Sequence, residues 1–74
     1  MTEPSDRLRA LISQSGMSAQ EFARQVLSRD PRSVRRYLAG EVIPPVLADW
    51  IRRVQSVTRT RTLVRVVVRV EEAE

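Results

Sequence analysis

The sequence contains no cysteine, no histidine and no lysine. Without cysteine the chain can form no disulfide and no thiolate metal site. Without histidine it has neither a histidine-ligated zinc site nor a Ser-His-Asp triad. The carboxylates that remain are scattered as helix caps and as an acidic C-terminal tail. We therefore expect no enzyme, no catalytic residue, no metal site and no cofactor.

Long apolar segments are also missing. No apolar run reaches membrane-spanning length, and the first five residues, Met-Thr-Glu-Pro-Ser, do not resemble a signal peptide. The 74 residues leave room for one small core but not for a separate ligand-sensing domain. We expect a cytoplasmic protein with no small-molecule ligand and no membrane partner.

The positive charge comes entirely from arginine. Thirteen arginines stand against nine acidic residues, and three of these acids lie among the last four positions. Residues 1–70 therefore carry a formal net charge of +7, from thirteen arginines and six acids. Clustered arginines in so small a domain indicate a polyanionic partner. The alternative is a charged surface that only keeps the protein in solution.

Residues 30–40, Asp-Pro-Arg-Ser-Val-Arg-Arg-Tyr-Leu-Ala-Gly, predict one short helix with two faces. Asp30 suits the N-cap, and Gly40 suits the stop. Three arginines, Arg32, Arg35 and Arg36, lie on one face near the start of this short helix, where positive charge opposes the helix macrodipole. An anion would remove this conflict, so we expect a recognition helix in the major groove of DNA. The other face is an apolar stripe at i, i+3 and i+4, formed by Val34, Tyr37 and Leu38.

Two helices are expected before this segment. The first is capped by Ser5 and runs over about residues 5–15, with Gly16 at its end. The second opens at Ser18, whose spacing to Glu21 is that of a capping box. A short link joins the second helix to the recognition helix, which predicts a helix-turn-helix.

The pattern changes toward the C-terminus. Residues from Pro45 to about Gln55 predict a fourth helix, with Trp50 on its apolar face and in the core. From Thr58 the sequence alternates at period two, which predicts one long, half-buried strand. A lone strand leaves its backbone groups unpaired, so its partner should be the same strand of a second copy. The residues expected at this dimer contact are Thr62, Val64, Val66, Val68 and Val70.

An antiparallel ribbon centred on Val66 is the expected register. A centre at Arg65 would place this arginine opposite its own copy, and a centre at Val67 would place it opposite Arg69. Like charges directly opposite each other are unfavourable. With Val66 on the two-fold axis, Arg65 lies opposite Val67, and the valine face packs on the helices.

The helical part resembles a known family. Phe22-Ala23, Val34-Arg35-Arg36-Tyr37, Gly40 and Pro44 are similar to the helix-turn-helix of the Cro and lambda-repressor-like (Xre-like) regulators, over about residues 8–54. The resemblance implies that Ala23 packs under Val34, although their spacing is one residue longer than is usual in that family. A helical domain followed by a strand is most similar to the Cro type, in which such a strand builds the dimer. The implied protein is a homodimeric repressor on a palindromic operator, from a phage, a mobile element or a bacterial operon.

Six residues are the expected contacts to double-stranded DNA: Gln20, Arg29, Arg32, Ser33, Arg35 and Arg36. Arg32 and Arg36 are the best candidates for reading guanine O6 and N7. Ser33 and Arg35 suit phosphates, and Gln20 suits a phosphate clamp at the start of the second helix. Arg24 is a weaker candidate.

The expected fold is mainly α with a C-terminal β-strand. A helix-turn-helix domain would occupy residues 1–56, and a dimerisation strand with an acidic tail would occupy residues 57–74. The alternative function is a small protein-binding module, an antitoxin or an inhibitor, whose strand extends the sheet of another protein.

Overall fold

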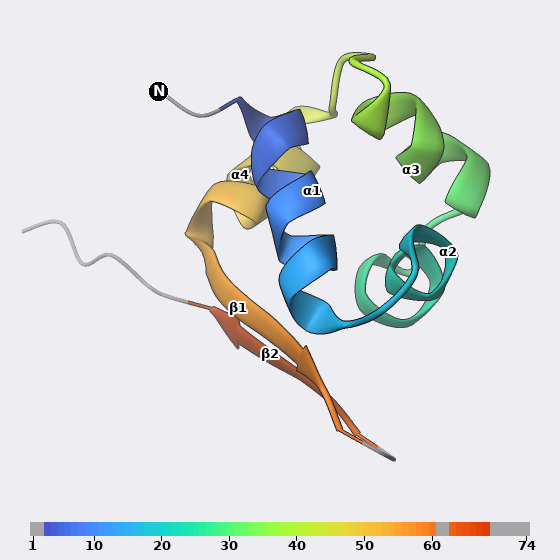
Figure 1. The fold of residues 1–74 in the computed structure, drawn as a ribbon. Coiled ribbons are helices and arrows are strands. Elements are labelled where there is room, and N and C mark those ends of the chain that lie inside the picture. Colours follow the sequence, from blue (N-terminus) through green and yellow to red (C-terminus); the bar gives the residue numbers. More distant parts are fainter. Residues whose placement is uncertain (1–2, 61–62, 69–74) are drawn as a thin grey trace, which may run out of the picture.

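The structure is a computed structural model, and it describes residues 3–60 and 63–68. In this part of the chain the elements are α1 (Pro4–Ser15), α2 (Ala19–Phe22), the π-helix η1 (Ala23–Leu27), α3 (Pro31–Leu38), α4 (Pro45–Arg53), β1 (Val54–Arg59) and β2 (Val64–Val68). α2 continues directly into η1, so four helices precede a two-stranded antiparallel sheet (Figure 1). The mainly helical fold with C-terminal β-structure is confirmed. None of the helices within residues 3–60 and 63–68 has the length and apolar character needed to cross a membrane.

Local signals set most of the helix boundaries. The Asp30 carboxylate caps α3 by accepting a hydrogen bond from the backbone N–H of Arg32 at 2.9 Å. Gly16 ends α1 in the left-handed region, with a φ of 75°. The expected cap at Ser5 is wrong, because Pro4 already occupies the first turn of α1 and Ser5 lies inside the helix.

One core joins the helices to β1. Trp50 of α4 is half-buried and packs against this core, as expected. Val57 belongs to the same core. The packing of the helical part therefore continues into β1, past residue 56, the expected end of the helix-turn-helix domain. The buried apolar residues are Leu8, Leu11, Ile12, Met17, Phe22, Ala23, Val34, Leu47, Ile51, Val54 and Val57.

The C-terminal region is a hairpin. β1 and β2 pair antiparallel, with Val57 opposite Val66. α4 ends at Arg53, so Gln55 lies in β1 and not in the helix. The predictions of one long strand and of a two-stranded ribbon between copies are therefore wrong, because β2 finds its partner strand within its own chain.

The turn of the hairpin gives no signal in the sequence. Residues 60–63, Thr-Arg-Thr-Leu, include no glycine, proline, asparagine or aspartate, which are the usual turn residues. The backbone N–H and the hydroxyl of Thr60 both donate to the Leu63 carbonyl, at 2.8 and 2.9 Å, and join the ends of the two strands. The predictions for Thr62 and Val70 lie outside the described residues.

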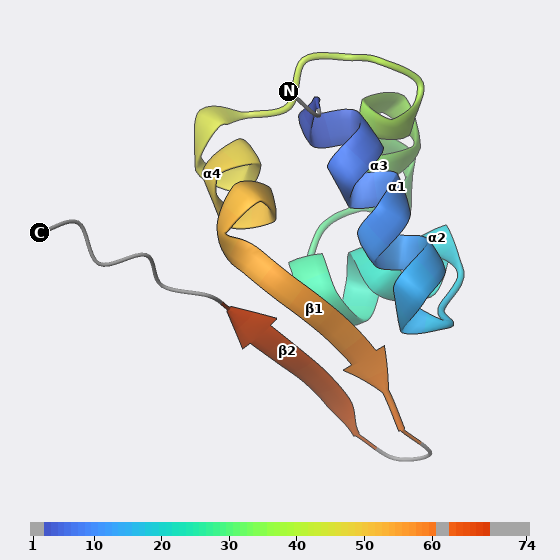
Figure 2. The same cartoon turned by 60° about the vertical axis from the view of Figure 1, so that its left-hand side comes forward.

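The two strands are buried to different degrees. Val54 and Val57 of β1 are each 1% exposed. Opposite residues in a sheet share a face, so the even-numbered valines of β2 lie on the helix side, but the expectation that all of them pack on the helices is wrong. Of these, only Val64 packs against the core, because β2 is the outer strand (Figure 2). The exposed fractions of Val66, Val67 and Val68 are 39%, 47% and 42%.

Candidate nucleic-acid interface

A π-helix lies before the turn that leads to α3. In η1 the backbone N–H groups of Ser28 and Arg29 both donate to the Ala23 carbonyl. A π-helix closes i→i+5 hydrogen bonds, so one turn holds one residue more than a turn of α-helix. This accommodates the additional residue between Ala23 and Val34, and both side chains are fully buried. Ser28 then reverses the chain in the left-handed region, with a φ of 51°.

α3 presents two arginines at the centre of its outer face. Val34 is fully buried, whereas Arg32, Arg35 and Arg36 are exposed. At about 100° per residue, Arg32 and Arg36 lie about 160° from Val34, one on each side. Arg35 lies about 100° away on one flank, and the half-buried Ser33 lies on the other. The central pair therefore points outward from the domain, between two flanking side chains.

The arginines in the described part of the chain divide into two groups. Five make hydrogen bonds or ion pairs within the fold: Arg7, Arg9, Arg52, Arg53 and Arg59. Across residues 3–60 and 63–68, the side chains of the other six form no such contact: Arg24, Arg29, Arg32, Arg35, Arg36 and Arg65. Five of these six lie within residues 24–36, on η1, the turn and α3. We call these five the free arginine cluster.

Two arginines of α1 hold the neighbouring elements in place. The Arg9 guanidinium donates to the carbonyl of Leu38 at the C-terminal end of α3, at 2.7 Å. Arg7 donates to the carbonyl of Val54, where α4 passes into β1, at 2.9 Å. The bond from Arg9 satisfies a carbonyl of the last turn of α3 and ties that helix to α1.

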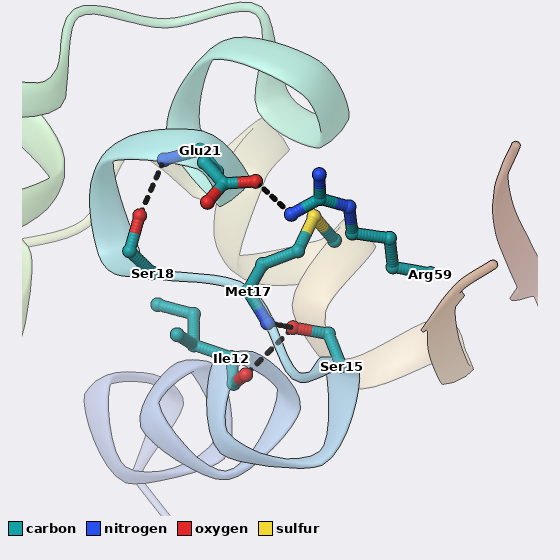
Figure 3. A network of polar contacts seen from close by, with 6 residues as sticks. All are labelled: Ile12, Ser15, Met17, Ser18, Glu21 and Arg59. Atoms are coloured by element: carbon teal, nitrogen blue, oxygen red, sulfur yellow. Dashed lines mark hydrogen bonds and ion pairs between the residues drawn. The ribbon is translucent and has the colours of Figure 1, made fainter. Parts of the chain in front are cut away.

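The start of α2 is capped and also joined to the hairpin (Figure 3). The Ser18 hydroxyl accepts a hydrogen bond from the backbone N–H of Glu21 at 3.2 Å, as expected for a cap. The Glu21 carboxylate pairs with Arg59 of β1. One half of the capping box is therefore confirmed, while the carboxylate of the other half joins α2 to the sheet. Gln20, the expected phosphate clamp, is exposed on this turn.

The macrodipole conflict expected for α3 applies to one arginine only. α3 has eight residues, and Arg35 and Arg36 lie in its last turn, where a helix favours cations. Arg32 alone lies in the first turn. The expectation of three opposed arginines is therefore wrong, and the evidence for an anionic partner is the exposure of these side chains together with their lack of contacts.

Comparisons of the chain with protein-family models, with curated proteins and with solved structures found no match. The interface is therefore argued from its own residues. All six expected DNA contacts lie on α2, the turn or α3, and all are exposed except the half-buried Ser33. Arg24 joins them as an exposed member of the free arginine cluster on η1, for which the sequence offered only its charge.

Proposed function

We propose that the protein binds double-stranded DNA sequence-specifically and acts as a small homodimeric transcriptional regulator, a repressor of the Cro kind. The observation that carries this proposal is the free arginine cluster, since most other described arginines are used within the fold. A polyanion would supply the negative charge that the cluster lacks. An α-helix with its side chains is about 10–12 Å across, so α3 would fit the major groove, which is about 12 Å wide.

The position of each side chain on α3 suggests its role. Arg32 and Arg36, at the centre of the outer face, would reach base edges and contact guanine O6 and N7. Arg35 and Ser33, on the flanks, would contact the phosphates on either side of the groove. Repression would follow from occupation of a promoter, with α3 of each copy in one half-site.

The outer edge of β2 is the surface that we infer for the second copy. The Thr60–Leu63 pair is hydrogen-bonded, and hydrogen-bonded and non-hydrogen-bonded pairs alternate along an antiparallel ladder. The backbone groups of alternate β2 residues therefore point away from β1, toward an edge that has no partner strand in the described part of the chain. Pairing there would make a four-stranded sheet with two strands from each copy. The residues with outward backbone groups are Val64, Val66 and Val68.

Selection of bound sites from random duplex DNA tests the proposed function. We expect a palindrome whose half-sites are about one helical turn, roughly 34–36 Å, apart. The logarithm of the binding constant should fall linearly with the logarithm of the salt concentration, because arginine–phosphate contacts release counterions. Recovery of no preferred sequence, together with a flat salt response, would contradict DNA binding.

Cysteine cross-linking tests the dimer edge, and the chain contains no native cysteine to interfere. Val64→Cys, Val66→Cys and Val68→Cys are oxidised separately as full-length proteins. In an antiparallel sheet centred on Val66, only that residue faces its own copy, at a Cα separation of about 5.5 Å that a disulfide can span. We expect Val66→Cys to link most readily. Faster linking of either other variant would make this register wrong.

The free edge of β2 also favours a second candidate, a module that binds another protein by strand addition. A shallow hollow beside the end of β2 would add an apolar contact for such a partner, and it is lined by Val46, Asp49, Trp50, Arg53 and Val68. This candidate predicts weak binding to all duplexes, with no sequence preference. The duplex selection therefore separates the two functions.

A further inference from the structure

We propose that Asp30 is a specificity-determining residue, whose carboxylate accepts a hydrogen bond from an exocyclic amino group of cytosine or adenine in the major groove. The inference rests on the proposed function, because it assigns a role at the N-terminal end of the helix that we propose to read DNA. Asp30 is exposed at the start of α3 and is the only acidic residue among residues 22–40. The N-terminal residues of a recognition helix are those that approach base edges.

The Asp30 carboxylate is oriented, and one of its oxygens remains available. Oδ1 accepts the hydrogen bond from the backbone N–H of Arg32 at 2.9 Å, which fixes the side chain against α3. The five arginines of the free cluster all lie within six positions of Asp30 in the sequence. In the described part of the chain, none of them comes within the 4.0 Å of an ion pair to this carboxylate. Oδ2 can therefore accept a hydrogen bond from a partner.

Capping alone does not require the negative charge of Asp30. Serine and asparagine cap helices as well as aspartate, and Ser18 does so at α2 of this protein. A carboxylate among arginines weakens their attraction to phosphates, whatever the DNA sequence. In the major groove it can gain a hydrogen bond only from a donor, which cytosine N4 and adenine N6 provide. Guanine O6 and thymine O4 are acceptors, so the carboxylate would repel them.

Asp30→Asn in the full-length protein tests the inference. The asparagine Oδ1 can still cap α3, and its amide NH₂ then places a donor where Oδ2 offered an acceptor. In duplex selection we expect the preference at one base position to change from cytosine or adenine to guanine or thymine, by about tenfold in affinity. The melting temperature should stay close to that of the parent, because the cap is kept.

Two further variants separate charge from recognition. Asp30→Ser keeps a cap through its hydroxyl but has no second side-chain oxygen that could contact a base. The preference at that base position should therefore be lost without being reversed. Glu41→Gln removes the same charge from an exposed residue just beyond α3. This control should raise the affinity for all duplexes alike and leave every base preference unchanged.

The outcomes distinguish this inference from the proposed function. If Asp30→Asn raises affinity uniformly, as Glu41→Gln does, and keeps the base preferences of the parent, Asp30 is only a cap and the inference is wrong while DNA binding stands. If the parent itself selects no sequence, the proposed function fails and the role of Asp30 falls with it. A reversal confined to one base position supports both.

Discussion

The arginines of α1 and the valines of β1 hold the fold together, whereas the arginines of α3 and most valines of β2 lie at the surface. Arg9 of α1 bonds a backbone carbonyl, while Arg36 of α3 contacts no acid or carbonyl in the described part of the chain. Val57 of β1 is 1% exposed, while its neighbour across the sheet, Val66 of β2, is 39% exposed. The same type of side chain therefore stabilises the fold in one element and remains at the surface in another.

The position of each element explains the difference. α1 crosses the middle of the molecule and packs on α3, α4 and β1, so its arginines reach backbone carbonyls of neighbouring elements. α3 and the hairpin lie on opposite sides of α1 (Figure 1). This outer helix and this outer strand each have a face without a neighbour among residues 3–60 and 63–68. These two faces are the ones that we propose for DNA and for a second copy.

The largest effect on stability should come from β1. Val57→Ala removes two methyl groups from a fully buried site and should lower the free energy of unfolding by about 2 kcal/mol. Val67→Ala in β2 removes the same groups from a side chain that is 47% exposed. This variant should change the free energy of unfolding by less than about 0.5 kcal/mol. Denaturant unfolding at low protein concentration, where dimers are dilute, measures both. Equal losses would contradict the distinction between the strands.

A smaller effect on the free energy of unfolding should distinguish the arginines of α1 from those of α3. Arg9→Ala removes the donor to the Leu38 carbonyl and should lower the free energy of unfolding by about 1 kcal/mol. Arg35→Ala removes an equally charged side chain that has no described partner, and should leave stability unchanged within about 0.5 kcal/mol. Thermal unfolding compares the two variants. A loss at Arg35 as large as that at Arg9 would show that the free arginine cluster also serves the fold.

Much of the helical part could be predicted from the sequence, because its signals are local. The cap at Asp30, the stop at Gly16 and the apolar stripe around Val34 depend on residues within a few positions of one another. The outer face of α3 follows from the same periodicity, so the sequence alone predicts Arg32 and Arg36 as its residues.

The predictions that are wrong concern segments whose conformation depends on tertiary contacts. The link between β1 and β2 lacks the residues that usually mark a turn, and the hairpin depends on pairing between the two strands. Val54 and Gln55 fit the helical pattern as well as a strand, and packing against α1 selects the strand. The sequence also cannot tell Arg9 from Arg32, because the carbonyl that Arg9 contacts is 29 positions away.

The most direct test of the account is an affinity titration of the selected duplex with two double variants. Arg32→Ala combined with Arg36→Ala removes the central pair of α3, and Arg52→Ala combined with Arg53→Ala removes the same charge from α4, where both arginines pair with Asp49. At about 1–3 kcal/mol for each base contact, the α3 variant should lose about 100-fold or more in affinity and all preference at two base positions. The α4 variant should stay within a few-fold of the parent and keep its sequence preference. Equal losses from both variants, or no loss from the α3 variant, would contradict the assignment of α3 as the element that reads DNA.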